Sequence, residues 1–153
     1  MEILEQILSP YIIAGMLGWI VAQSAKYLII SAKRGRLVTP RQLYGSGNMP
    51  SAHSATVVAV LTVIALIDGI NSGLFGLALI FASVVLYDAV MVRRSSGEQG
   101  ASLTALIKEQ KSQVRLPRVA KGHTPLEVAV GALLGVVVGL ASHELYFALI
   151  GVL

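Results

Sequence analysis

The sequence predicts an all-α integral membrane protein, and three observations support that prediction. Hydrophobic residues make up 55% of the 153 residues, charged residues make up only 13%, and the mean hydropathy is +0.75. A soluble domain of this size carries roughly a quarter charged residues. The apolar residues also fall into long runs, close to the roughly 20 residues that a helix needs to cross a bilayer. We therefore expect one membrane domain that covers the whole chain.

Four apolar runs are candidate membrane spans. They cover residues 7–31, 51–67, 74–92 and 125–149. Polar connections occupy residues 32–50 and 93–124, and within the second of these the apolar residues of 101–113 share one helical face. We expect a four-helix bundle with a short interfacial helix between the third and fourth spans. The fourth span is either one long helix or a span followed by a short interfacial piece.

The distribution of charge predicts the orientation of this bundle. All twelve Lys and Arg residues lie in the first or third connection or at the helix ends beside them. The charged residues of the other connection and of the two chain ends are all acidic, namely Glu2, Glu5, Asp68 and Glu144. By the positive-inside rule, the basic connections are cytoplasmic and both termini are on the non-cytoplasmic side of the inner (plasma) membrane. The first run lacks a basic start and a convincing cleavage site, so we expect a retained span and not a signal peptide.

A glycine-containing loop at residues 45–56 leads into the second span. Pro50 suits the first turn of a helix, and Asn48 or Ser51 can cap the free backbone amides. A helix N-terminus with exposed N–H groups, hydroxyls and the imidazole of His53 favours an oxyanion such as phosphate. An ordinary turn and helix cap is the competing interpretation.

Ionisable residues gather near the expected cytoplasmic side. They are Lys26, His53, Asp88, Arg93, Arg94, His123 and Glu127. Such residues in membrane spans are functional candidates by default, although Lys26 and Arg94 could instead extend to the lipid head groups. His123 and Glu127 are four residues apart and would share one face of a helix. A carboxylate bonded to one imidazole nitrogen would make the other a better nucleophile or base.

Two histidines with several cations suit phosphoryl transfer. One imidazole attacks phosphorus, the other protonates the leaving oxygen, and cations with backbone amides hold the phosphoryl oxygens. A zinc or iron site made of the two histidines with Asp88 and Glu127 is the rival, but the excess of positive charge favours an anion. The chain has no cysteine, so thiolate ligands and disulfides are excluded. We expect no metal, no cofactor and no nucleic acid partner.

In these segments the sequence resembles the type-2 phosphatidic acid phosphatase and vanadium haloperoxidase superfamily, and more closely its small, divergent bacterial and plant branch. The matching segments are residues 47–55, residues 87–94 with Gly97 and Gln99, and residues 122–128, together with Lys26. The resemblance implies metal-free hydrolysis of a phosphomonoester through a phosphohistidine.

The resemblance also implies a role for each residue. His123 would be the nucleophile, with Glu127 in the place of the usual aspartate, and His53 would be the general acid. The implied phosphate-binding residues are Lys26, Ser51, Ala52, Arg93 and Arg94, with Asp88, Asn48 and Arg118 in support. The arginine of the third motif stays open among Arg93, Arg94 and Arg118.

We therefore expect a lipid phosphatase at the cytoplasmic leaflet, because a site at the membrane interface suits a substrate with an apolar tail and a charged head group. A non-catalytic protein that binds an anion or a lipid phosphate on the same scaffold is the alternative. A transporter or channel is a third possibility, but the outer halves of the spans carry no polar residues that would line a path.

Small residues on the fourth span predict close helix packing. Gly131, Gly135 and Gly139 form a stripe at four-residue spacing, which allows another helix to approach closely. We expect this stripe to hold the start of the fourth span against the second span, or to support a homodimer. His143 and Glu144 lie at the far end of the same span, and we expect no catalytic role for them.

Overall fold

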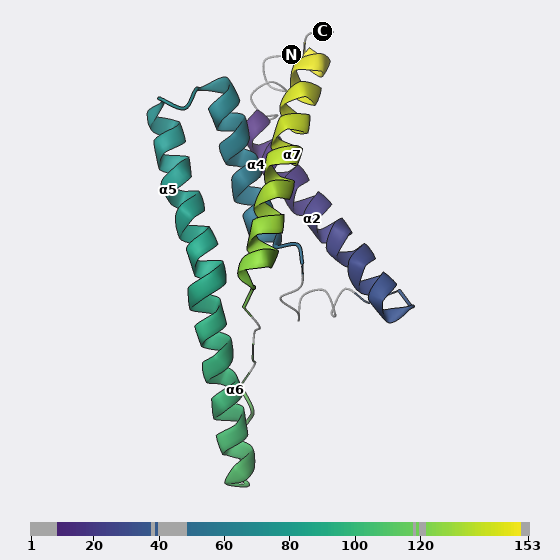
Figure 1. Ribbon diagram of the computed structural model, residues 1–153, viewed down its shortest axis with the longest axis vertical. Helices are drawn as coiled ribbons and strands as arrows, with labels where there is room; N and C mark the ends of the chain where they lie inside the picture. Colours follow the sequence, from purple (N-terminus) through teal and green to yellow (C-terminus); the bar gives the residue numbers. More distant parts are fainter. Residues whose placement is uncertain (1–8, 38, 40–48, 118, 120–121, 151–153) are drawn as a thin grey trace.

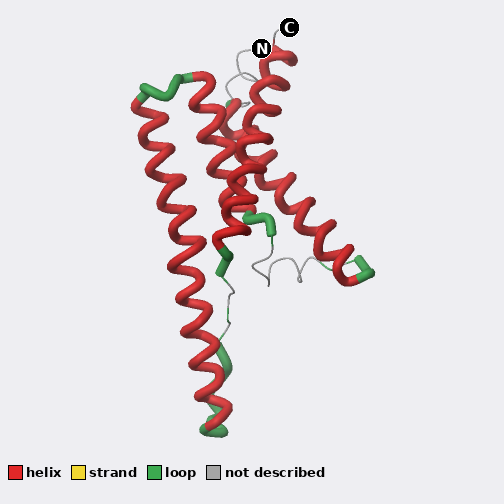
Figure 2. Tube along the Cα trace, in the orientation of Figure 1, coloured by secondary structure: helices red, strands yellow, loops and turns green. Residues whose placement is uncertain are grey.

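The structure is a computed structural model that describes residues 9–37, 39, 49–117, 119 and 122–150. Within these ranges the chain is helical and contains no strand (Figure 2). The elements are α2 (Pro10–Arg34), α4 (Ala52–Ile67), α5 (Gly73–Tyr87), the π-helix η1 (Asp88–Val92), α6 (Arg93–Glu109) and α7 (Pro125–Ile150). The all-helical prediction is confirmed for this part of the chain.

Three helical segments are long and apolar enough to cross a membrane. They are Pro10–Arg34, Gly73–Glu109 and Pro125–Leu149. The fourth apolar helix, α4, has 16 residues, and it spans about 24 Å against a hydrocarbon thickness of about 30 Å. The protein is therefore a helical membrane protein. That it crosses the membrane four times, and that both termini lie on the non-cytoplasmic side, stay predictions.

The helix α4 lies at the centre of the bundle. It packs against α2, α5 and α7, and α2 also contacts α7. Successive helices alternate in direction, so α2 begins and α7 ends at the same end of the bundle (Figure 1). The opposite end holds the beginnings of α4 and α7, and the candidate site lies there.

Local sequence explains where two of these helices begin or end. Gly35 ends α2 in the left-handed conformation, with φ of 62° and its N–H bonded to the carbonyl of Ala32. Ser51 caps α4, because its side-chain oxygen accepts a bond from the N–H of Ser54 at 3.4 Å. Pro50 precedes this cap, so the expectation that Pro50 occupies the first helical turn is wrong. Asn48, the other proposed cap, lies outside the described residues.

The expected short interfacial helix is not a separate element. The chain stays helical from Gly73 to Glu109, through α5, η1 and α6. These 37 residues span about 55 Å, well beyond the hydrocarbon thickness of about 30 Å. The polar segment after Arg93 therefore extends the third helix (Figure 1). In α7 the helix continues unbroken past Ser142, whose hydroxyl donates to the carbonyl of Gly139 at 3.0 Å.

Glycines allow α2 and α7 to approach α4 closely. A Cβ atom added to Gly135 would lie 2.6 Å from the carbonyl oxygen of Ala55, and one added to Gly18 of α2 would lie 3.0 Å from the same oxygen. Gly131 and Gly139 lie equally close to α4. The small-residue stripe thus packs within the chain. The expectation that it holds the fourth span against the second is confirmed. The other expectation, a homodimer through Gly131, Gly135 and Gly139, is wrong because α4 covers that face.

We expect Gly135→Val to lower the free energy of unfolding by about 2 kcal/mol or more, because the new side chain meets the backbone of α4. The measurement is the thermal melting of the protein in detergent, followed by circular dichroism. The matched control is Leu133→Val on the exposed face of α7, where 67% of the leucine surface is accessible. Equal melting temperatures for the two variants would contradict this packing.

Candidate functional site

The start of α4 is bonded directly to the start of α7. The N–H of Ser51 donates to the carbonyl oxygen of Glu127 at 3.1 Å. Gly131, one turn further along α7, faces the backbone of Ser51, and a Cβ there would lie 2.5 Å from the Ser51 carbonyl oxygen. As in any helix, the first amides of α4, those of Ala52 and His53, have no acceptor within the helix. This contact sets the capped end of α4 beside the segment that carries His123.

A π-turn shapes the third helix at the level of this contact. The N–H of Arg93 bonds to the carbonyl of Asp88, five residues back. In a regular α-helix two residues five apart point about 140° away from each other. In η1 the side chains meet instead, and the Nε of Arg93 donates to Oδ2 of Asp88 at 2.7 Å. The π-turn therefore pairs Arg93 with Asp88 and fixes the direction of the guanidinium.

The same turn holds the segment that carries His123. Because the N–H of Arg93 bonds to Asp88, the carbonyl of Ala89 can accept the N–H of His123, at 3.2 Å. Gly122 lies against the backbone of Arg93 and Arg94, where a Cβ would overlap main-chain atoms. Only glycine fits at that position. The histidine is thus attached by its own backbone to the third helix, just before α7 begins.

The imidazole of His123 is buried without a hydrogen bond. Both ring nitrogens are inaccessible to solvent and have no partner in the described part of the chain. Burial is the main cause that lowers the pKa of His123 below its usual 6.5, and the positive charge of Lys26 adds to it. Glu127 opposes this shift, while His53 and Arg93 add to it. The ring is therefore mainly neutral at pH 7, and one ring nitrogen carries a lone pair that no group in the described part of the chain uses.

The carboxylate of Glu127 has a different partner from the one expected. Its Oε2 accepts the N–H of Thr124 at 2.8 Å, and the Thr124 hydroxyl oxygen accepts the N–H of Glu127 at 3.3 Å. This reciprocal pair is a capping box at the start of α7. His123 precedes the helix, so the predicted helical face shared by His123 and Glu127 does not form. The expected hydrogen bond between them is absent, and Glu127 acts on the imidazole only through its charge.

Lys26 and His53 complete the cluster. Lys26 is buried in α2, with only 6% of its surface accessible. The charge of Glu127 acts on it. His53 lies in the first turn of α4, and the charges of Arg93, Lys26 and Asp88 act on it. Four separate segments of the chain therefore contribute to one charged cluster.

The structure separates the candidate arginines. Arg93 interacts with both histidines, whereas Arg94 pairs with Glu98 on the exposed surface of α6, with Nε and Oε1 3.1 Å apart. Arg118 and Asn48 lie outside the described residues. As to a metal site, no group of three or more His, Asp and Glu side chains within the described ranges is arranged to hold an ion.

Comparisons with known proteins identify the family of this chain. The sequence pattern of the divergent PAP2 family, PAP2 being type-2 phosphatidic acid phosphatase, matches residues 7–138. The chain belongs to the divergent PAP2 family. It is also similar to the uncharacterized membrane protein YuiD of Bacillus subtilis (strain 168), with 36% identity over 111 residues, or 62% of this chain and 70% of the relative. No solved structure matches the chain.

Some contributors to this candidate site were not foreseen. Thr124 could have been recognised, because a threonine followed three residues later by glutamate at the start of an apolar run is the signature of a capping box. Gly122 carries no such signal, since its role depends on the third helix. The π-turn at Asp88 carries none either, because its residues are ordinary helix formers.

We expect the imidazole of His123 to titrate below pH 6.5. Lys26→Met removes a positive charge that disfavours the imidazolium, so the midpoint should move to higher pH. Glu127→Gln keeps an acceptor for the capping box but removes a negative charge, so the midpoint should move to lower pH. The measurement is a histidine NMR titration in detergent, with His123→Ala to assign the signal. Shifts in the opposite directions would contradict this charge arrangement.

Proposed function

We propose that this protein hydrolyses a lipid phosphomonoester at the cytoplasmic leaflet, through a phosphohistidine and without a metal. The observation that carries the proposal is the buried imidazole of His123. It has no hydrogen-bond partner among the described residues, and Lys26, Arg93 and His53 all act on it. A neutral nucleophile surrounded by cations is the arrangement that attack on a phosphate requires.

In the proposed reaction a ring nitrogen of His123 attacks phosphorus, and the bond from phosphorus to the lipid oxygen breaks. His53, which must enter this step as the imidazolium, gives its proton to that leaving oxygen. Water then attacks the phosphohistidine, its proton goes back to His53, and inorganic phosphate and neutral His123 are released. Lys26, Arg93 and the first amides of α4, with the Ser51 cap, stabilise the charge on the phosphoryl oxygens. Asp88 orients Arg93, and Glu127 stabilises positive charge on His123.

The position of the cluster supports a lipid substrate. It lies at the end of the bundle where the basic residues of α2 and α6 also lie, which the positive-inside rule assigns to the cytoplasm. A phosphate head group can reach cations there while its tail stays in the bilayer. Phosphatidate, phosphatidylglycerophosphate and polyprenyl phosphates all have this chemistry.

One observation favours a second candidate, a non-catalytic lipid-phosphate-binding protein. The carboxylate of Glu127 is bonded to Thr124 and does not orient His123. In enzymes that use an imidazole nucleophile, a third group usually orients the ring. A chain without such a group could bind phosphate without turning it over.

We expect the wild-type protein to release phosphate from at least one long-chain lipid phosphate in detergent that contains EDTA. His123→Ala and His53→Ala should each lower the rate by about 10²- to 10⁴-fold. His143→Ala is the matched control, because His143 lies near the other end of α7. If the folded wild type binds lipid phosphate but releases no phosphate, the result favours the non-catalytic candidate. If release is seen without EDTA and lost when EDTA is added, the result favours a metal site.

The two neighbouring arginines provide a second test. Arg93→Ala should lower kcat/KM by about ten- to a hundredfold, because a charged hydrogen bond to phosphate is lost. Arg94→Ala, whose side chain pairs with Glu98, should change kcat/KM by less than about threefold. Equal losses in both variants would contradict the assignment of Arg93.

A further inference from the structure

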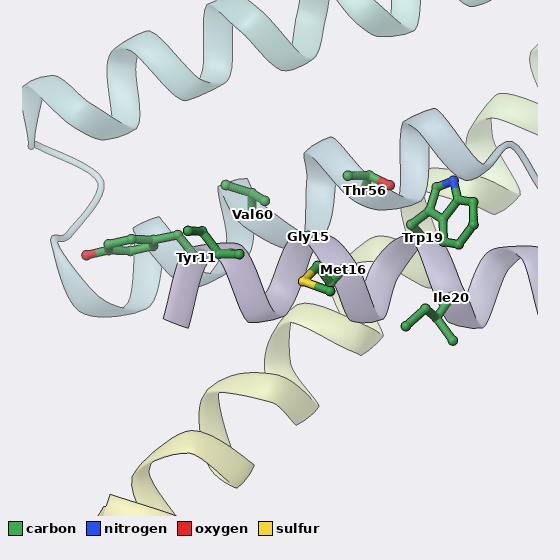
Figure 3. Close-up of a pocket in the computed structure, with 8 residues that line it drawn as sticks. Tyr11, Gly15, Met16, Trp19, Ile20, Thr56 and Val60 are labelled. Carbon is green, nitrogen blue, oxygen red and sulfur yellow. The ribbon is translucent and has the colours of Figure 1, made fainter. Parts of the chain in front are cut away.

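An apolar groove runs along the side of α2 and α4. It has a volume of about 570 Å³ and is lined chiefly by Tyr11, Ile12, Met16, Trp19, Thr56 and Val60 (Figure 3). Gly15 also lines it, and a side chain at that position would reach towards Val60 and Thr56. Ile12 and Met16 are about 60% exposed, so the groove opens on the side of the bundle that faces lipid.

The groove offers only apolar surface to a ligand. The hydroxyl of Thr56 donates to the carbonyl of Ala52 at 2.8 Å, and the hydroxyl of Tyr11 donates to Oδ2 of Asp68 at 2.7 Å. Both hydroxyls are therefore engaged within the protein, and the exposed lining is almost wholly apolar. A hydrocarbon chain satisfies such a lining, whereas a polar ligand would lose hydrogen bonds there.

The end of the groove at Trp19 and Thr56 is the one nearer to the candidate site along both helices. On α2, Trp19 lies two turns before Lys26 and on almost the same side of the helix, since seven residues make nearly two full turns. On α4, Thr56 lies one turn after His53. Gln23 lies between Trp19 and Lys26, and its buried amide oxygen has no partner in the described ranges. Beyond this end of the groove, α2 and α4 thus carry the ionisable side chains of Lys26 and His53.

We propose that the groove holds a long hydrocarbon chain of the lipid whose phosphate binds at Lys26, His53 and His123. This assignment rests on the proposed function. The distance along α2 from Lys26 to Tyr11 is about 22 Å, which suits a long chain. Lipid tails are as apolar as the groove, so the hydrophobic effect adds little inside the bilayer. The head group supplies the affinity, and packing in the groove directs the chain.

The single tryptophan of the chain lies in this groove and reports on its occupant. The full chain carrying His123→Asn, which leaves lipid intact, is reconstituted in phosphatidylcholine vesicles. Phosphatidic acid with brominated acyl chains, which quench tryptophan at short range, is then added. We expect saturable quenching of Trp19 beyond that caused by equally brominated phosphatidylcholine. Unbrominated phosphatidic acid should reverse it.

Variants that fill the groove should abolish the excess quenching. Gly15→Leu fills it from α2 and Val60→Phe fills it from α4, so the second variant decides the outcome if the first does not fold. Leu133→Phe is the matched control on the exposed face of α7, and it should keep the full effect. Retained excess quenching in a folded groove variant would overturn the proposal.

The outcomes separate this proposal from the proposed function. Phosphate release from phosphatidic acid by the wild type, with no excess quenching of Trp19, would overturn the groove assignment and leave the phosphatase intact. Excess quenching, together with no phosphate release by the wild type from any of the three kinds of lipid phosphate, would support the groove and overturn the phosphatase. If Trp19 fluorescence does not respond to brominated phosphatidic acid and becomes shielded when the protein dimerises, the groove proposal is overturned. The groove would then be assigned to a second copy of the chain.

Discussion

The close approach of α4 to α2 and α7 is the constraint on which the candidate site depends. Gly18 and Gly135 reach the carbonyl of Ala55 from two different helices. Membrane helices associate by such backbone contact, because surrounding lipid removes the hydrophobic drive between them. The contact fixes the axial position of α4 relative to α7, so that Ser51 is bonded to Glu127. The capped end of α4, with His53, therefore lies beside the segment that carries His123. Without it, His53 in the first turn of α4 and His123 just before α7 would not be held side by side.

The π-turn at Asp88–Val92 links the third helix to this arrangement. It pairs Arg93 with Asp88 and provides the carbonyl of Ala89 to which the backbone of His123 is bonded. One extra residue in the turn thus positions both an anion-binding group and the proposed nucleophile. π-turns of this kind often occur at functional sites for this reason.

The charges around His123 serve two purposes in the proposed chemistry. Lys26 and Arg93 attract a phosphate, and their positive charge also disfavours the imidazolium. The site is therefore prepared for an anion while its nucleophile stays neutral. The apolar groove beside α2 would extend this division, because its lining is apolar and its Trp19 end lies two turns along α2 from Lys26. Head group and tail would then be bound by different parts of the same two helices.

The sequence by itself determined the membrane class, the approximate helices, the stripe of glycines on α7 and the family, because apolar runs, small-residue spacing and the histidine motifs are local patterns. Only the tertiary structure decided what those residues do together. It assigned Glu127 to the cap of α7, distinguished Arg93 from Arg94, joined the polar segment to the third helix and used the glycine stripe within the chain. Each of these outcomes depends on contacts between distant segments or on one inserted helical residue. Neither leaves a periodic signal that could be recognised in advance.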